Sequence, residues 1–309
     1  FRVLEDDGLT ALSKMDAKRI PAFINPESGT AEGARTVLAA GPFDVHEVPP
    51  SELRARIADV VEAGATRVLV AGGDGTIRTA VEIVAGKPVE LAVLPAGTLN
   101  HFAKDHELPV DLDKAAVTAA RAPAGPVDVG RVGEHLFHGT SSIGAYVLFM
   151  RIRDRLEPRL GYRISTFIAG ILTFFRMPSI AVELDIDGAK RIYRTPLLFV
   201  AVGERELKLP TLGGRVKGGK RGLHLMIVHG RRKARMLVLA LDAFSNGVRE
   251  ASRAPEFDAF IVDRCTIRMR RRHARISFDG EAQNIETPLE YQLERDMLLL
   301  VGGETSTPA

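Results

Sequence analysis

The chain has 309 residues, of which 45% are hydrophobic and 26% are charged, and its formal net charge is +3. This length accommodates two domains, and the ordinary composition excludes an intrinsically disordered protein. The single cysteine, Cys265, excludes an internal disulfide framework, and its strand-like surroundings do not favour a catalytic thiol.

Strands alternate with helices over the first third of the chain, as in a parallel α/β sheet. Apolar and β-branched stretches predict strands at 18–24, 43–48, 68–71 and 91–94. Helically spaced apolar residues predict helices near 32–40, 52–64, 77–84 and 114–121. We interpret Ser51, Thr76 and Asp113 as N-caps of the last three of these helices.

Three of the strands end in loops rich in Gly, Asn and Thr. The loops read Asn25-Pro-Glu-Ser-Gly29, Gly72-Gly-Asp-Gly-Thr76 and Pro95-Ala-Gly-Thr-Leu-Asn100. The glycines permit positive φ and close approach of a ligand to the backbone, and a helix N-terminus favours anions. The carboxylate of Asp74 suits Mg²⁺ that accompanies phosphates, or a substrate hydroxyl. One such turn fits any α/β protein, but three at the carboxyl ends of strands indicate a phosphate site.

The pattern changes after Pro126 to short strand-like stretches separated by Gly and Asp turns, such as Asp187-Gly188. These stretches are 127–132, 134–137, 179–185, 190–202, 222–228, 258–269 and 275–278. We therefore predict an N-terminal Rossmann-like domain over 1–126 and an antiparallel β-sandwich domain over 127–309. A last strand at 296–301 could return to the first domain.

A helical stretch at 151–177 interrupts the second domain and combines arginines with the apolar segment 164–175. It fits the wall of an apolar pocket, an interfacial helix or an ordinary core helix. Basic residues occur in three clusters that fit anionic lipid headgroups or an ordinary solvated face. The clusters are Arg151, Arg153, Arg155, Arg159 and Arg163; Arg231, Arg232, Lys233 and Arg235; and Arg268, Arg270, Arg271 and Arg272. The absence of Trp argues against a nucleic-acid partner.

In order and spacing, these motifs resemble the diacylglycerol kinase catalytic-domain family of lipid kinases, which includes sphingosine and ceramide kinases. The resemblance runs from about Arg19 to Val301. Further markers are Val127-Asp-Val-Gly130, Ser141-Ser-Ile-Gly144 and Phe278-Asp-Gly-Glu281. It implies a nucleotide cleft between the two domains, ATP and Mg²⁺ as cofactors, and a lipid hydroxyl as phosphoryl acceptor, either diacylglycerol-like or a sphingoid or ceramide lipid.

By motif matching, the resemblance implies that ATP contacts residues of the three loops. These are Asn25, Pro26, Ser28, Gly29, Gly72, Gly73, Asp74, Gly75, Thr76, Thr98 and Asn100. Glu281 is implied as the general base, with Asp74 and Asp279 as further catalytic carboxylates and Asp128 as a supporting acidic residue. Without the resemblance, Asp-Gly-Glu is better interpreted as a plain solvent turn.

Three positions depart from the family pattern: Arg78, His101 and the turn Gly219-Lys220-Arg221-Gly222. Bacterial members commonly carry an acidic turn that holds a structural Mg²⁺ where Lys220 and Arg221 stand here, so we predict that this metal site is absent. An NAD kinase-like enzyme and a catalytically degenerate lipid-binding protein remain the alternatives.

No stretch approaches the ~20 apolar residues of a transmembrane helix, and the N-terminal residues lack a signal-peptide pattern. We therefore expect a cytoplasmic protein that associates peripherally with the inner face of the membrane. A homodimer is left open. Disorder is not expected outside the two ends, 1–16 and 302–309.

Overall fold

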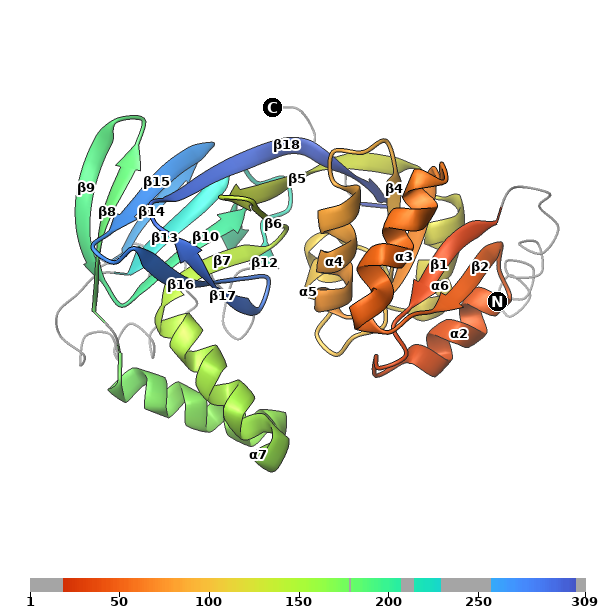
Figure 1. The fold of residues 1–309 in the computed structure, drawn as a ribbon, viewed down its shortest axis with the longest axis horizontal. Helices are drawn as coiled ribbons and strands as arrows, with labels where there is room; N and C mark the ends of the chain where they lie inside the picture. Colours follow the sequence, from red (N-terminus) through yellow and green to blue (C-terminus); the bar gives the residue numbers. More distant parts are fainter. Residues whose placement is uncertain (1–18, 178, 207–213, 229–256, 304–309) are drawn as a thin grey trace. The chain divides into compact units, whose positions relative to one another are not determined.

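The computed structural model describes residues 19–177, 179–206, 214–228 and 257–303 (Figure 1). The predictions for the N-terminal end, for residues 304–309 and for the cluster Arg231, Arg232, Lys233 and Arg235 fall outside these residues. The chain divides into two compact units. The first runs to Val129 and takes up the chain again from Glu294, whereas the second comprises Gly130–Leu293.

The first unit contains a parallel sheet with strand order β2-β1-β3-β4, and the C-terminal part of β18 pairs in parallel with β4. The strands are β1 (Ile20–Ile24), β2 (Phe43–Glu47), β3 (Arg67–Gly72), β4 (Glu90–Pro95) and β18 (Leu289–Val301). The last five residues of both β3 and β4 are buried, as expected of parallel strands covered on both faces.

Within residues 19–129 of this unit, the structure describes five helices. They are α2 (Ala31–Ala39), α3 (Pro50–Glu62), α4 (Asp74–Val84), α5 (His101–Asp105) and α6 (Leu112–Arg121). Helices α2 and α6 pack on each other, and α3 packs on α4. The buried residues Ala31, Ala34 and Leu38 recur at helical spacing on α2 and form its inner face.

All three predicted N-caps are wrong. Helix α3 begins at Pro50, because proline at the first helical position needs no hydrogen-bond acceptor. Helix α6 is capped by Asp111, whose carboxylate accepts a hydrogen bond from the N–H of Lys114 at 3.1 Å. Helix α4 begins at Asp74, so Thr76 lies inside its first turn.

The second unit is built of antiparallel strands. One sheet has the order β14-β13-β10-β7-β16-β17, and β15, β8, β9 and the N-terminal part of β18 form another. The remaining described strands are β5 (Ala124–Val132), β6 (His135–Phe137), β7 (Thr140–Gly144), β8 (Ile180–Ile186), β9 (Ala189–Thr195), β10 (Leu197–Val202), β11 (Arg205–Glu206), β12 (Gly214–Arg215), β13 (Leu223–Val228), β14 (Phe257–Val262), β15 (Arg264–Met269), β16 (His273–Phe278) and β17 (Glu281–Glu286). The predicted combination of an α/β domain with an antiparallel β domain is confirmed.

Two predicted long strands are each two strands in different sheets. The stretch 190–202 breaks at Pro196, where β9 ends and β10 begins. The stretch 258–269 breaks at Asp263, between β14 and β15. A continuous apolar pattern hides such a change of sheet, because both halves bury side chains in the same core.

The predicted helix 151–177 is α7 (Ala145–Phe175), which bends at Gly161 into the two segments visible in Figure 1. Gly161 has a non-helical φ of 71°, a conformation that glycine adopts without a steric cost. Among the described residues, no helix is long and apolar enough to cross a membrane.

Candidate functional site

In the first unit, the three Gly-rich loops lie at the carboxyl edge of adjacent strands β1, β3 and β4 and hold one another. The carbonyl of Ala96 accepts hydrogen bonds from the hydroxyls of Ser28 and Thr30. The N–H of Ala96 donates to the carbonyl of Gly72 at 3.0 Å, which ties the third loop to the second. The strand order brings these loops together, as the sequence predicts.

Asn25 joins the first loop to the second. Its Nδ2 donates to Oγ1 of Thr76 at 3.2 Å, and its Oδ1 accepts the N–H of Glu27 at 3.0 Å. Its own N–H donates to the carbonyl of Ala71 at 3.0 Å. Asn25 therefore fixes the turn that carries Pro26, Ser28 and Gly29.

The glycines of the second and third loops serve close packing of the backbone. None of Gly72, Gly73 and Gly75 has a positive φ, so the prediction of positive φ is wrong for these three residues. A Cβ at Gly97 would lie 2.5 Å from the Cα of Gly73, and one at Gly72 would lie 2.6 Å from the Thr76 side chain. Only glycine lets these two loops touch.

Asp74 opens α4 and points one carboxylate oxygen at the next helix. Its Oδ1 accepts the N–H of Phe102 at 3.0 Å, which satisfies a donor in the first turn of α5. No side chain caps the N-terminus of α4 within the described part of the chain. The N–H groups of this first turn can therefore receive an anion, and the helix dipole favours it.

The third loop ends at Asn100, which adopts the left-handed conformation with φ 51°. Its Oδ1 accepts the N–H of Gly97 at 3.0 Å, so Asn100 shapes the loop. Thr98 lies exposed at the tip of this loop, and His101 is exposed at the start of α5. Arg78, the other departure from the pattern, faces Glu82 one helical turn away at 3.8 Å.

Asp128 is a buried acidic residue of β5. It is 2% exposed, and its Oδ1 accepts the N–H of Asp296 at 3.0 Å. Asp296 has a positive φ of 54° within β18. The buried carboxylate therefore supports the strained backbone of the returning strand.

In the second unit, Asp279 and Gly280 form the two-residue turn between β16 and β17, with φ of 47° and 86°. Two consecutive positive φ values identify a type I′ turn, which Asp-Gly sequences favour. Glu281, the first residue of β17, is exposed beside this turn. Its neighbour Asp279 has a side chain only 2% exposed.

The Asp279 carboxylate accepts three backbone hydrogen bonds from the segment before β7. The donors are the N–H groups of His138 at 2.8 Å, Gly139 at 2.8 Å and Thr140 at 3.1 Å. The N–H of Asp279 returns a bond to the carbonyl of Thr140. These contacts fix the hairpin that presents Glu281.

The buried Arg205 is a residue that the sequence reasoning missed. It is 5% exposed, and its guanidinium donates to the carbonyls of Val202 and Gly139. Through Gly139, Arg205 thus contacts the same segment whose N–H groups bond to Asp279. Nothing in the local pattern distinguishes it from a surface arginine, because burial here results from long-range pairing of strands.

Lys220 and Arg221 belong to a turn whose backbone is held by Glu204, since Glu204 Oε2 accepts the N–H of Lys220 at 2.9 Å. Among the described residues, no group of three or more His, Cys, Asp or Glu side chains is placed to hold a metal ion. Cys265 is buried, and burial raises the pKa of its thiol to about 12. Burial likewise raises the pKa of Tyr291, whose hydroxyl pairs with that of Ser141 at 2.9 Å.

Comparison with known proteins supports the resemblance seen in the motifs. Residues 19–132 match the sequence model of the family described as diacylglycerol kinase catalytic domain. A diacylglycerol kinase of Mycobacterium tuberculosis is 28% identical over 196 residues, which cover 59% of this chain and 63% of that protein. The Pseudomonas putida protein named Probable lipid kinase YegS-like is 33% identical over 136 residues, which cover 43% of this chain and 45% of that protein.

The alignments thus span about half of these relatives' length. A solved structure of a diacylglycerol kinase from Bacillus anthracis superimposes with a TM-score of 0.67 at 17% identity and covers 93% of this chain and 98% of that chain. A second structure from that organism gives a TM-score of 0.70 at 20% identity. The predicted resemblance is confirmed, and the structural likeness establishes the fold.

Proposed function

We propose that this chain is an ATP-dependent lipid kinase, which transfers the γ-phosphoryl group to a hydroxyl of a diacylglycerol-like or sphingoid or ceramide lipid. The observation that carries the proposal is the set of three interlocked loops at the carboxyl edge of the parallel sheet. They lie within residues 19–132, the region that matches the kinase family. The two relatives named above, a diacylglycerol kinase and a YegS-like lipid kinase, support a lipid acceptor.

The uncapped N-terminus of α4 suits the phosphates of ATP. Gly73 and Gly97 bring two loop backbones into contact, which leaves no Cβ between a phosphate and the backbone N–H groups. Asn25 and Asn100 hold the flanking turns in shape, and Thr98 at the exposed tip is free to contact the nucleotide. We assign nucleotide binding to these loops.

Mg²⁺ fits this site as an ion delivered with ATP. Protein-bound Mg²⁺ keeps several waters and needs only one or two carboxylates besides substrate phosphates. Asp74 is the carboxylate that we propose for it, because only one of its oxygens bonds to Phe102. When bound, Mg²⁺ would neutralise charge on the transferred phosphoryl group.

Glu281 is proposed as the general base. Its carboxylate accepts the proton of the lipid hydroxyl as the hydroxyl oxygen bonds to the γ-phosphorus and the bond from that phosphorus to ADP breaks. Asp279 is proposed as a positioning residue instead of a second catalytic carboxylate. All three of its hydrogen bonds go to backbone N–H groups that anchor the hairpin.

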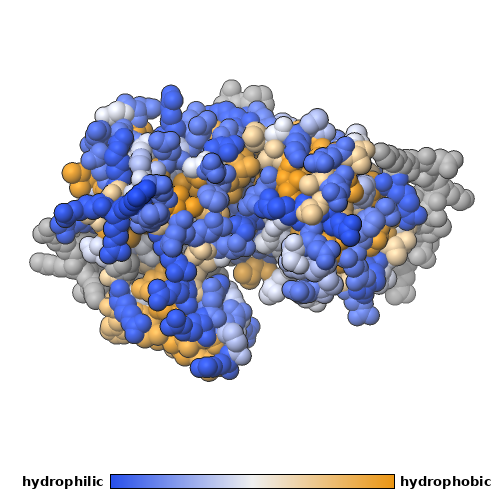
Figure 2. Space-filling model, viewed as in Figure 1, coloured by the Kyte–Doolittle hydropathy of each residue, from blue (hydrophilic) through white to orange (hydrophobic). Residues whose placement is uncertain are grey.

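Peripheral membrane association is part of the proposal, and α7 is the element that supports it. After the bend, α7 exposes Ile164 (55%), Phe167 (70%), Ile171 (43%) and Phe175 (67%). Their spacing of three and four residues places them on one helical face. Figure 2 shows a hydrophobic surface over α7 bordered by hydrophilic residues. A helix with this apolar face and flanking arginines suits an anionic lipid surface.

The proposal is tested by incubating the protein with Mg²⁺ and γ-labelled ATP and with separate micelles of diacylglycerol, ceramide, sphingosine and phosphatidylglycerol. NAD serves as a parallel acceptor. Label in one lipid is expected and would name the acceptor. Label in NAD alone would favour an NAD kinase-like enzyme, and ATP binding with no labelled product would favour a degenerate lipid-binding protein.

A further inference from the structure

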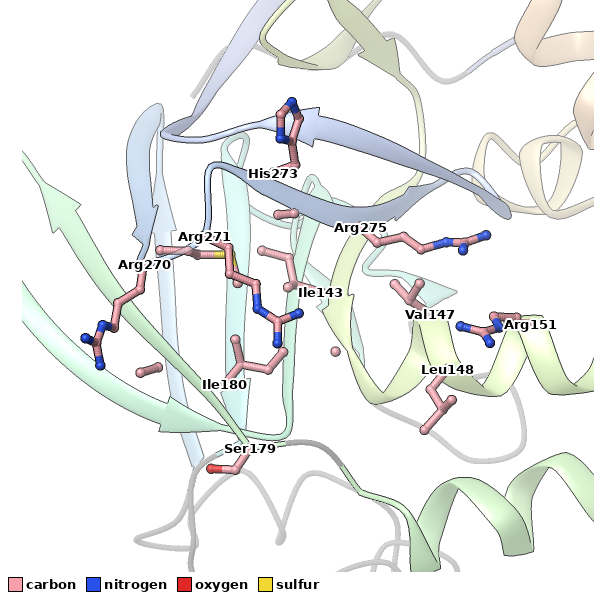
Figure 3. A pocket seen from close by; sticks show the side chains of 14 residues that line it. Ile143, Val147, Leu148, Arg151, Ser179, Ile180, Arg270, Arg271, His273 and Arg275 are labelled. Carbon is pink, nitrogen blue, oxygen red and sulfur yellow. The ribbon is translucent and has the colours of Figure 1, made fainter.

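The second unit contains a pocket of about 430 Å³ that the proposed mechanism does not use (Figure 3). It lies where β7 leads into α7, beside the start of β8 and the connection between β15 and β16. Its apolar surface comes from Ile143, Val147, Leu148, Ile180 and Met269. The volume lies in the range of small-molecule sites and suits a headgroup with the first part of an acyl chain.

Four arginines line the same pocket: Arg151, Arg270, Arg271 and Arg275. All four are exposed, and none forms an ion pair with another residue of the described ranges. No Asp or Glu belongs to the described lining. His273, which also lines the pocket, adds no negative charge. As far as the described residues go, the pocket therefore carries positive charge that no carboxylate of its lining balances, beside an apolar surface.

Neighbouring arginines are paired, in contrast to these four. Arg268 bonds to Asp185 at 2.9 Å, and Arg272 bonds to Glu286 at 3.1 Å. Carboxylates are thus present on the adjoining strands, but other arginines use them. In Figure 3, Arg271 extends toward Ile143 and Ile180, whereas Arg270 and His273 point away from them.

An apolar surface with unpaired guanidinium groups matches an anionic amphiphile. Guanidinium forms strong, bidentate bonds with phosphate, and the apolar side chains gain free energy by covering hydrocarbon. We propose that this pocket binds an anionic phospholipid, with its phosphate on the exposed arginines of the lining and its proximal acyl chain on Val147 and Leu148.

This ligand is a membrane-anchoring lipid that is separate from the phosphoryl acceptor. Arg275 lies three residues before the end of β16, about 10 Å along the strand from the turn that presents Glu281. Helix α7 begins at the pocket and leads to the exposed apolar face that starts at Ile164. The pocket and that face together would hold this unit on an anionic membrane.

The test is calorimetric titration, in the absence of ATP, with a short-chain phosphatidylserine below its micelle concentration, because this anionic lipid has no hydroxyl that could accept a phosphoryl group. A monomeric lipid removes the general attraction between a basic protein and an anionic surface. We expect binding by the wild type and at least about tenfold weaker binding by the double variant Arg271→Gln/Arg275→Gln. The double variant Arg56→Gln/Arg194→Gln removes two exposed arginines outside the pocket and should bind as the wild type does.

Three further titrants complete the test. Glycerol phosphate and inorganic phosphate should bind far more weakly than the lipid, and Leu148→Ser should weaken lipid binding alone. If glycerol phosphate bound as tightly as the anionic lipid, the proposal that the pocket also binds the acyl chain would be wrong. If a short-chain phosphatidylcholine bound as tightly, the proposed requirement for a net negative charge would be wrong. Absence of lipid binding by the wild type would overturn the proposal that this pocket is a lipid site. Each result is independent of kinase activity, so failure of the proposed function would leave this test intact.

Discussion

The Asp279 carboxylate allows a sharp prediction, because its three hydrogen bonds are the anchor of the hairpin that carries Glu281. We consider the variant Asp279→Asn. Asparagine tolerates the left-handed conformation as aspartate does, so the type I′ turn itself is retained. What changes is one oxygen, which becomes an NH₂ group facing the N–H of His138 across 2.8 Å.

The cost follows from burial. The side chain is 2% exposed, so water cannot replace the lost acceptor. Loss of one hydrogen bond to a charged group, together with an unsatisfied buried donor, is expected to cost about 3–5 kcal/mol. For a unit of this size, that corresponds to a melting temperature lower by about 10 °C. The kinase rate should fall as well, because the hairpin that presents Glu281 is loosened.

The chain offers a matched control in Asp187-Gly188, a second Asp-Gly turn with φ of 50° and 85°. The Asp187 side chain is 74% exposed, so Asp187→Asn should leave the melting temperature within about 1 °C. The assay is thermal unfolding, with hydrogen exchange of the β16 and β17 amides to locate the effect. Equal melting temperatures for Asp279→Asn and the wild type would refute the reasoning, as would an equal loss in the control.

Three other perturbations test different parts of the molecule. Gly97→Ala forces a Cβ to 2.5 Å from the Gly73 backbone, so calorimetry should show weakened ATP binding, whereas Gly29→Ala meets open space and should fold normally. Cys265 keeps its proton in the folded state between pH 9 and 12, so stability should fall as pH rises through this window, by up to about 1.4 kcal/mol per unit. Denaturant titrations of Cys265→Ala should show that the stability of this variant falls less steeply with pH over the same range. Phe167→Ser should reduce sedimentation with anionic vesicles. Ile192→Ser changes an apolar residue on β9 that is also largely exposed, and it should not reduce sedimentation.

Much of the first unit follows from the sequence, because each of its signals is local. Buried strands read as apolar runs, and the loops at their carboxyl ends contain the Gly and Asn that their turns require. Local signals alone also lead to wrong positions for the first residues of the helices. A cap such as Asp111 is recognised only when the position of the first helical turn is known, and Asp113 offers an identical side chain two residues later.

The second unit was harder to derive, because its contacts join distant segments. Asp279 lies about 140 residues from the N–H groups that it binds, and β9 and β10 change sheets within one apolar stretch. Packing explains why several positions of the sequence motifs are occupied by glycine. A Cβ at Gly130 would lie 2.2 Å from the Phe137 ring, and Gly144, with φ 100°, would meet the Pro196 carbonyl at 2.3 Å.

The most direct test of the account is phosphoryl transfer to the lipid acceptor, measured side by side for the wild type and Glu281→Gln. The variant keeps the size of the side chain but cannot accept the hydroxyl proton. We predict labelled lipid from the wild type, a loss of at least about a hundredfold in kcat for the variant, and an ATP affinity within about twofold of the wild type. Turnover by Glu281→Gln at the wild-type rate would contradict the assignment of the base, and a wild type that labels no lipid would contradict the proposed kinase.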